Sequence, residues 1–351
     1  MLDWVTAVLP CTHEPLPAGS VFSVDADGSI EWATVKRLTV RGSHESSIKV
    51  RSIGSNGEGK ATHLYLDGNP SKFLQGHSVV GSDDLNGLVL VTYARILSLL
   101  KIPHDMVSYR QVMQGQYKIS RVDINYMFSL RTLENVRSWL YAAEFKAKTR
   151  HGRACSKGGT VYLGKNSRRW SLKFYSKYDE HTSGKKGHQI ADEFVEQGML
   201  DWTKDKLRIE LTLRTTELID LTLTLGSSWG LETPRKLFSD YVGRIEMNQN
   251  TILTDEKMAE IPRKVLATYL LWKQGANMKE RLPHNTFYRH RRELLCVGID
   301  INFYCGDPDT NNVIPLIRTL EACPVEIPQW MYSKGLIFEY HKPSSTRNLA
   351  Y

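Results

Sequence analysis

The 351-residue sequence lacks an apolar run long enough to cross a membrane, which takes about 18 residues. The best candidate, between Leu85 and Leu100, is interrupted by Asn86, Thr92 and Arg95. The N-terminus also lacks the basic start that precedes the apolar stretch of a signal peptide. We therefore expect a cytoplasmic protein without membrane contact.

The sequence is also poor in metal and redox motifs. Its five cysteines are widely spaced and include no CxxC pair, so zinc binding and dithiol chemistry are not indicated. Reduced thiols are expected, and a disulfide between Cys296 and Cys305 is the alternative that remains open. The Gly/Lys stretch at 183–187 lacks the strand, the spacing and the Ser/Thr of a phosphate-binding loop, so we expect a flexible loop there.

Positive charge is what the sequence has in excess. The formal net charge is +8, and ten Lys or Arg residues lie between Glu144 and Asp179 without an intervening acid. Aromatic residues are interleaved in this stretch, as they are in surfaces that follow a nucleic-acid backbone and stack on its bases. A solvated basic face is the alternative interpretation. The distribution favours a polyanionic partner.

Hydrophobic periodicity predicts an α+β fold. Alternating segments predict strands at Trp4–Leu9, Val21–Val24, Ile30–Leu38, Ser47–Ile53, Thr62–Leu66, Lys118–Phe128, Thr160–Leu163, Trp170–Tyr175 and Leu207–Leu213. Helical spacing predicts helices at Asp83–Lys101, Thr132–Lys146, Thr233–Ile245, Thr254–Gln274 and Pro283–Cys296. We expect a mainly antiparallel sheet flanked by helices over residues 1–246, followed by a helical region over residues 247–351.

Six motifs in the same order resemble the gene II replication initiators of filamentous phages and, more distantly, plasmid rolling-circle initiators. They are NPSKFLQGHSVVGSDDL from Asn69, KISRVDINYMF from Lys118, SLKFYSKYDE from Ser171, LRIELTLR from Leu207, LPHNTFYRHRRELLCVGID from Leu282, and NNVIPLIRTL followed by PQW. The resemblance covers most of the chain. It implies that a tyrosine nicks the plus-strand origin, becomes linked to the 5′ end, leaves a free 3′ hydroxyl and later rejoins the displaced strand.

Tyr175 is the candidate nucleophile. A phenol has a pKa near 10, so at neutral pH it needs a nearby cation or base and a polarised phosphate. Lys177 would share a face with Tyr175 on a strand and could stabilise the phenolate or the phosphate. The family pattern of tyrosine, lysine and glutamate falls on Tyr175, Lys177 and Glu180. Tyr178 is the alternative nucleophile, and a purely structural role for both tyrosines also remains open.

The resemblance implies a divalent cation, Mg²⁺ or Mn²⁺, which takes oxygen ligands and often only one or two carboxylates. Asp123 and Glu210 are the leading ligand candidates, because each is a lone acid in an otherwise apolar strand. The alternative is that they form partly buried ion pairs with Arg121 and Arg208.

Two further residues are candidates for the metal site. Glu180 could be a third ligand or a general base, and His77 in a Gly-rich turn could be a ligand or a phosphate contact. An isolated histidine is more often structural. The sequence lacks the pair of histidines flanking a hydrophobic residue that marks the best-known superfamily of nicking enzymes, which leaves the ligand geometry open.

Contacts to DNA are expected from the basic stretch and from the C-terminal helix. Asn285 or Thr286 could cap that helix, whose arginines could reach a DNA groove, and a solvated basic helix is the alternative. The candidate DNA-binding residues are Lys165, Arg168, Arg169, Lys173, Arg289, Arg291 and Arg292.

The residues and the resemblance together predict a rolling-circle initiator that acts as a DNA endonuclease and strand transferase in the host bacterial cytoplasm. Its expected partners are double-stranded origin DNA and the displaced single strand, with a host helicase and DNA polymerase implied by the family and a homodimer on DNA as one assembly. A non-catalytic DNA-binding protein and a conjugative-type relaxase are the alternatives. In coliphage members a shorter protein resembling residues 247–351 starts internally, and Met247 lies near the matching place.

Overall fold

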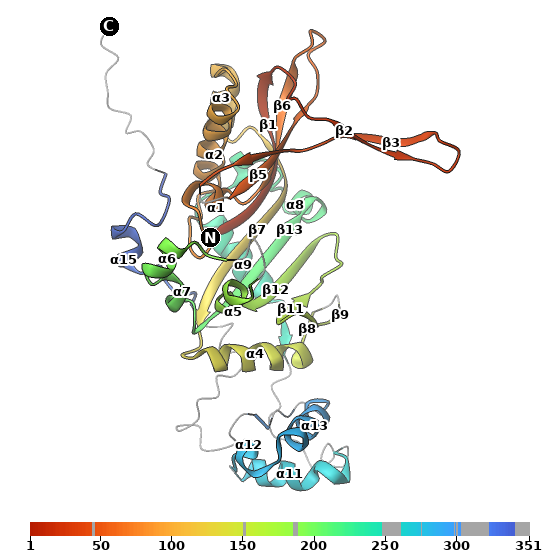
Figure 1. Ribbon diagram of the computed structural model, residues 1–351, viewed down its shortest axis with the longest axis vertical. Helices are drawn as coiled ribbons and strands as arrows, with labels where there is room; N and C mark the ends of the chain where they lie inside the picture. The colour runs from red at the N-terminus through yellow and green to blue at the C-terminus, as the bar shows by residue number, and fades with distance from the viewer. Residues whose placement is uncertain are drawn as a thin grey trace.

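The structure is a computed structural model (Figure 1). It describes residues 1–43, 46–149, 152–184, 189–247, 261–274, 276–297, 299, 301–302 and 323–340.

A nine-stranded antiparallel sheet forms the centre of the molecule (Figure 1). The strand order is β10-β11-β12-β13-β7-β1-β6-β5-β4. The strands are β1 (Leu2–His13), β4 (Leu38–Arg41), β5 (Ser47–Ile53), β6 (Ala61–Gly68), β7 (Lys118–Ser129), β10 (Cys155–Lys157), β11 (Thr160–Leu163), β12 (Trp170–Ser176) and β13 (Lys206–Arg214). A small sheet contains β8 (Ala147–Thr149), β9 (Gly152–Arg153) and β14 (Glu246–Met247), and a separate ribbon contains β2 (Ser20–Val24) and β3 (Ile30–Val35).

The two faces of the large sheet differ in chemistry, because side chains alternate along each strand. In β13 the alternate residues Leu207, Ile209, Leu211 and Leu213 are fully buried on one face. Directly opposed residues of antiparallel strands share a face, so these leucines and Ile209 meet the apolar side chains of β12 and β7. The apolar face carries most of the hydrophobic core.

Helices cover the apolar face. They are α2 (Leu85–Leu99), α3 (Met106–Met113), α4 (Leu133–Lys146), α8 (Thr215–Asp220) and α9 (Thr233–Val242), with a short 3₁₀ turn at Gly226–Ser228. The side chains of Asp84, Asp105 and Thr132 cap the first turns of α2, α3 and α4 by accepting hydrogen bonds from backbone N–H groups. From α4, Trp139 packs against Phe174 with ring centroids 5.5 Å apart.

Shorter helices lie beside these, and the first of them contributes Phe73 to the apolar core. They are α1 (Pro70–Gln75), α5 (Lys177–Thr182), α6 (Asp192–Glu196), α7 (Met199–Trp202) and α15 (Gln329–Ser333). Gly76 ends α1 with φ of 89°, a left-handed conformation that glycine adopts without steric cost. A separate apolar cluster joins the loop at residues 76–82 to α6, α7 and α15; its buried members are Val79, Val80, Met127, Phe194, Met199, Met331 and Leu336.

The C-terminal helices α11 (Arg263–Lys273), α12 (Met278–Arg281) and α13 (His284–Leu295) form their own core. They contact the sheet domain through α4. The Arg291 guanidinium lies 3.9 Å from the centroid of the Tyr141 ring, and Asn302 donates to the Ser138 hydroxyl at 3.0 Å. Residues 323–340 leave this group and pack on the sheet domain, where the Val325 N–H donates to the Met127 carbonyl at 2.8 Å.

The predicted fold class is confirmed, and the predicted strands correspond to strands of the structure. The premise that Lys177 lies on a strand is wrong, because β12 ends at Ser176 and the Ser176 hydroxyl caps α5 from Lys177 onward. The predicted helix Thr254–Gln274 lies partly outside the described residues, within which α11 begins at Arg263.

In the described part of the chain, no helix is both long and apolar enough to span a membrane. The cysteines of this part, Cys11, Cys155, Cys296 and Cys323, are free, and Cys305 lies outside it.

The fully buried Leu211 tests the importance of the apolar face. Leu211→Ala should lower the free energy of unfolding by about 2–5 kcal/mol, because it removes buried apolar surface and leaves a cavity between β12 and β7. The matched change Leu231→Ala, at a residue 64% exposed, should cost less than about 0.5 kcal/mol. Urea unfolding followed by circular dichroism compares the two, and equal stabilities would contradict this description of the core.

Candidate functional site

Strand register brings a row of polar side chains together on the second face of the sheet. Lys173 of β12 opposes Glu210 of β13, which opposes Asn125 of β7. One step along, Tyr175 opposes Arg208, and on the other side of Glu210, Thr212 opposes Asp123. Since opposed residues share a face, these side chains form a continuous polar band across three central strands. We call this band the polar row: Lys173, Tyr175, Arg208, Glu210, Asn125 and Asp123.

Tyr175 lies inside this row with only 4% of its surface exposed. Its hydroxyl donates a hydrogen bond to Glu210 Oε2 at 3.1 Å, and Lys173 Nζ donates to the same oxygen at 3.4 Å. Burial raises the pKa of Tyr175 well above the usual value, while the charge of Arg208 acts in the opposite direction. The phenol is therefore neutral in this state, and its hydroxyl is hydrogen-bonded to a carboxylate.

Three cations surround the Tyr175 ring. Lys173 Nζ lies 4.2 Å from the ring centroid, Lys177 Nζ 5.8 Å and Arg208 Cζ 6.0 Å. Lys173 is the most exposed of the three, with 28% of its side chain accessible, whereas Lys177 and Arg208 are buried. An anion approaching Tyr175 would meet Lys173 first. Each of the three cations is paired with a carboxylate, namely Glu210, Glu180 and Asp3.

Arg208 is fully buried. It donates to the carbonyls of Ser78 and Val79 and forms an ion pair with Asp3 at 3.2 Å. Within the described part of the chain, its Nε atom has no hydrogen-bond partner, nor has the buried Nδ2 atom of Asn125. Buried donors are nearly always paired, so these two unsatisfied groups are what a site for an anionic ligand would provide.

Lys177 reaches the site from the first turn of α5. Its ammonium donates to Glu180 at 2.6 Å and to the Ser78 hydroxyl at 3.3 Å. Burial alone would raise the pKa of Glu180, but the charge and hydrogen bond of Lys177 outweigh burial and lower it to about 2. Burial and the charge of Arg208 lower the pKa of Lys177 itself. Glu180 is thus ionised and engaged with Lys177.

Asp123 lies at the other end of the polar row, 3% exposed. Its carboxylate accepts two hydrogen bonds from Arg121, at 2.9 and 2.5 Å. Burial raises the pKa of Asp123 to about 7; the Arg121 hydrogen bond opposes this rise, and the charge of Glu210 adds to it. The ion pair between Asp123 and Arg121, which the sequence analysis gave as an alternative, is therefore present. Glu210 pairs instead with Lys173 and Tyr175, while Arg208 pairs with Asp3.

The carboxylate oxygens of Asp123 and Glu210 are suitable ligands for a hard divalent cation. Both carboxylates lie on one face and affect each other electrostatically, as the pKa of Asp123 shows. Their interaction would be relieved by a bound cation, and two carboxylates with a phosphate and waters are a common Mg²⁺ arrangement. Among the described residues, no group of three His, Cys, Asp or Glu side chains gathers as a metal cluster, so protein ligands beyond these two are not assembled there.

His77 lies away from the polar row. Its ring is buried, with Nε2 2.7 Å from the Leu336 carbonyl and Nδ1 3.4 Å from the Val79 N–H. It also makes an edge contact with Phe194, with ring centroids 5.0 Å apart. Through these contacts His77 connects the 76–82 loop to the C-terminal segment, which is a structural role.

The candidate DNA contacts of the basic stretch differ in availability. Lys165 and Arg168 are exposed, and Lys165 Nζ lies 4.9 Å from the centroid of the Tyr162 ring on β11. Arg169 is engaged with α8, where it forms ion pairs with Glu217 at 2.7 Å and with Asp220.

The arginines of α13 divide in the same way. Arg289 and Arg292 are exposed, whereas Arg291 is 7% exposed and faces Tyr141 of α4. Arg291 therefore contributes to the contact between the C-terminal helices and the sheet domain.

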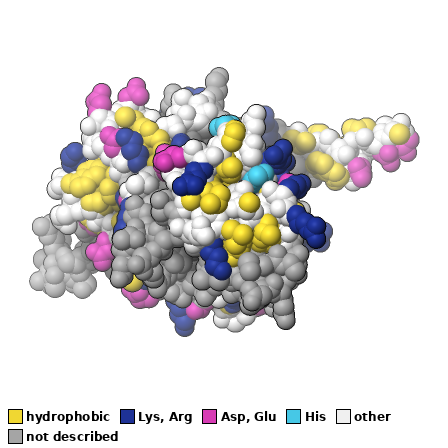
Figure 2. All heavy atoms as spheres, turned by 90° about the horizontal axis from the view of Figure 1, so that it is seen from below, with side chains coloured by type: hydrophobic (Ala, Val, Ile, Leu, Met, Phe, Trp, Pro, Cys, Tyr) yellow, Lys and Arg dark blue, Asp and Glu magenta, His cyan; other side chains and the backbone are white. Residues whose placement is uncertain are grey.

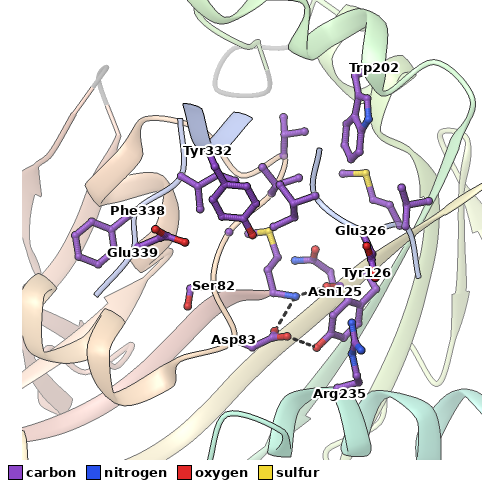
Figure 3. A pocket seen from close by; sticks show the side chains of 18 residues that line it. Ser82, Asp83, Asn125, Tyr126, Trp202, Arg235, Glu326, Tyr332, Phe338 and Glu339 are labelled. Carbon is purple, nitrogen blue, oxygen red and sulfur yellow. Dashed lines mark hydrogen bonds and ion pairs between the residues drawn. The ribbon is translucent and has the colours of Figure 1, made fainter. Parts of the chain in front are cut away.

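A cavity of about 490 Å³ lies beside the 76–82 loop, between the sheet domain and residues 325–339 (Figure 3). Asp83 and Tyr126 point toward each other at its base, with the Tyr126 hydroxyl donating at 2.8 Å. The polar row contributes Asn125 to its wall. Tyr175 is not among the lining residues, so the cavity is adjacent to the polar row and does not contain it.

Sequence reasoning identified Tyr175, Lys177, Asp123 and Glu210 but assigned no role to Asp3. Asp3 comes beside Arg208 only through folding, since 205 positions separate them. The sequence pattern does indicate Arg208 as a candidate. It lies with Glu210 on the polar side of a strand whose other side is wholly apolar.

The family model for the N-terminal part of the replication-associated gene II protein matches residues 1–232, and the model for its C-terminal part matches residues 253–337. The replication-associated gene II protein of Enterobacteria phage I2-2 is 56% identical over 345 residues, which is 98% of this chain and 100% of the relative. No solved structure matches.

Asp123 should make stability depend on pH. Its pKa of about 7 in the folded protein exceeds the value of 3.8 expected when unfolded, so the folded state binds the extra proton between these values. The contribution of Asp123 to stability is therefore lost as pH rises from about 4 to 7. Asp123→Asn mimics the protonated form. As pH rises over this range, its free energy of unfolding should therefore increase relative to that of wild type by a few kcal/mol. Urea unfolding at pH 4.5 and 8 in chelator measures the gain, and a constant difference would contradict it.

Proposed function

The chain belongs to the family of replication-associated gene II proteins, and from this premise we propose that it initiates rolling-circle replication by nicking the plus strand of an origin. The observation that carries the proposal is the Tyr175 hydroxyl, hydrogen-bonded to the Glu210 carboxylate among three cations. It supplies a nucleophile, a base and positive charge in one place, which a purely structural tyrosine does not need.

In the proposed reaction the Tyr175 oxygen attacks the phosphorus of the scissile phosphodiester. Its proton passes to Glu210 Oε2, which already accepts the hydrogen bond at 3.1 Å. The bond from phosphorus to the 3′ oxygen breaks, and that oxygen takes a proton from solvent to become the free 3′ hydroxyl. The 5′ phosphate remains esterified to Tyr175. Attack by a 3′ hydroxyl on this ester reverses the steps and rejoins the strand.

The cations stabilise the charge that develops on the phosphate. Lys173 can leave Glu210 for a phosphate oxygen at low cost, since their contact is long, at 3.4 Å, and Lys173 is partly exposed. Arg208 is held by Asp3 and by the 76–82 loop, so its positive charge is fixed in place before substrate arrives. Pre-positioned charge of this kind contributes strongly to catalysis because it requires no reorganisation during the reaction.

Asp123 and Glu210 are the residues that would hold Mg²⁺ or Mn²⁺. Glu180 and His77 are not included as ligands, because Glu180 is bonded to Lys177 and His77 to the Leu336 carbonyl. When bound, the cation would polarise the phosphate and help to position it.

The proposed partners follow from this reaction. Exposed Lys165, Arg168, Arg289 and Arg292 are available to contact duplex origin DNA or the displaced strand. In the bacterial cytoplasm a host helicase would separate the strands and a host polymerase would extend the free 3′ end.

Tyr175→Phe should abolish the covalent adduct, because it removes the attacking oxygen and leaves the ring. Purified protein is incubated with labelled supercoiled origin plasmid and Mg²⁺ or Mn²⁺, and the products are resolved on denaturing gels with peptide mapping of the adduct. Tyr178→Phe is the matched control, since Tyr178 lies on α5 near Lys204; it should nick like wild type.

Three other results would each revise the proposal. An adduct that persists in Tyr175→Phe and disappears in Tyr178→Phe would move the nucleophile to α5. Origin binding by wild type without any nick would favour a non-catalytic binding protein. Nicking without an adduct would exclude tyrosine attack.

Metal binding should depend on the two carboxylates of the polar row. Asp123→Asn and Glu210→Gln should each weaken Mn²⁺ affinity by at least about tenfold, since each removes a charged oxygen ligand. Asp220→Asn, at a carboxylate on α8 that is 55% exposed, is the control and should bind Mn²⁺ as wild type does. Titration calorimetry without DNA measures the affinities, so the result does not depend on activity. Unchanged affinity in both variants would place the metal elsewhere.

A further inference from the structure

The β2–β3 ribbon projects from the body as an arm (Figure 1). We use this name for residues 20–35. Its two strands pair mainly with each other, and a contact at its base is the hydrogen bond from Arg51 to Thr34 at 3.2 Å. An isolated two-stranded ribbon is marginally stable in water. Such a ribbon is expected to be stabilised by a surface on which it packs.

The arm exposes large apolar side chains that the body does not cover. They are between 43% and 62% exposed: Val21, Phe22, Val24, Ile30, Trp32 and Val35. Cross-strand pairing puts Phe22 opposite Ala33 and Val24 opposite Ile30 on one face. This face is continuous and apolar, which is typical of a surface that binds another protein.

The charge of the arm excludes DNA as the preferred partner. Residues 20–35 contain Asp25, Asp27 and Glu31 and no Lys or Arg. Figure 2 shows hydrophobic side chains along the arm and acidic ones at its end, whereas Lys and Arg lie over the body. Ribbons that enter DNA grooves must approach phosphates, which these carboxylates would repel. The fitting partner is an apolar surface with positive charge.

The body of this chain has such a surface on α3. Met106, Arg110 and Met113 share one face of that helix by their spacing, and Met106, Val107 and Met113 are 66%, 68% and 52% exposed. Lys101 and Arg110 are exposed beside them. We call these five residues the α3 patch. In Figure 1 the arm extends away from α3 of the same molecule. The side chains of the α3 patch are exposed and therefore accessible to a second molecule.

We propose that the arm of one copy docks on the α3 patch of a second copy. Apolar side chains of the arm cover Met106, Val107 and Met113, while its carboxylates lie near Lys101 and Arg110. Reciprocal exchange of arms between two copies makes this contact twice and closes a two-fold dimer. The surface and the partner are independent of the nicking chemistry proposed above.

Sedimentation velocity of the full-length protein without DNA, over a concentration series, tests the contact. Wild type should self-associate, and the double change Phe22→Ser with Ile30→Ser, which removes two apolar side chains of one face of the arm, should raise the dissociation constant at least about tenfold, as for apolar interface anchors. Leu231→Ser, at an exposed residue outside both surfaces, is the matched control and should associate as wild type does. Urea unfolding verifies that the body is folded in each variant.

A charge exchange identifies the docking surface. Glu31→Lys and Arg110→Glu should each weaken association, and both changes in one chain should restore it, because the pair then attracts with reversed signs. The proposal is overturned if wild type stays monomeric at every concentration, if the arm variant associates like wild type, or if the combined variant is no stronger than the single ones. Loss of DNA affinity in the arm variant with unchanged association would likewise overturn it and make the arm a DNA contact.

Discussion

A buried positive charge at Arg208 is the constraint on which the candidate site depends. Moving a guanidinium out of water is costly unless charges and hydrogen-bond acceptors replace the lost hydration. Asp3 of β1 and the carbonyls of Ser78 and Val79 provide that replacement. Because these groups come from separate parts of the chain, Arg208 holds β13, β1 and the 76–82 loop in one arrangement. Tyr175, opposite Arg208 in the register, is positioned by the same contacts.

Stability and chemistry are divided between the two faces of the sheet. The apolar face, with Leu207, Ile209, Leu211 and Leu213 under the helices, provides hydrophobic burial. The polar row has the opposite effect, because burial of the Asp123 carboxylate raises its pKa, and Asn125 Nδ2 has no hydrogen-bond partner among the described residues. Such destabilising arrangements persist where the surrounding structure enforces them, and they are concentrated at functional sites.

The strands and the two acids Asp123 and Glu210 could be predicted from the sequence alone, because local patterns encode them. Alternation in LRIELTLR set Glu210 apart as a lone carboxylate on a strand, and the same logic found Asp123. Strand register was not readable from sequence, yet it is register that places Glu210 beside Lys173 and within reach of Tyr175.

Other features depended on contacts between distant segments or on local capping. Lys177 was placed on a strand, but the cap at Ser176 turns the chain into α5, and Lys177 reaches the ring from there. The roles of His77 and Arg291 depend on partners far away in sequence, Leu336 and Tyr141. A lone histidine or arginine in sequence gives no indication of such a partner.

The C-terminal segment at 323–340 connects the end of the second family region to the polar row. His77 and Gln75 bind backbone groups of Leu336 and Phe338, at 2.7 and 2.9 Å. These contacts hold the 76–82 loop from one side, while Arg208 and Lys177 hold its Ser78 from the other. A shift of the segment would therefore move the carbonyls that compensate the charge of Arg208. The two regions matched by separate family models are thus connected through the 76–82 loop, so the C-terminal region supports the arrangement around Tyr175 in addition to carrying its own helices.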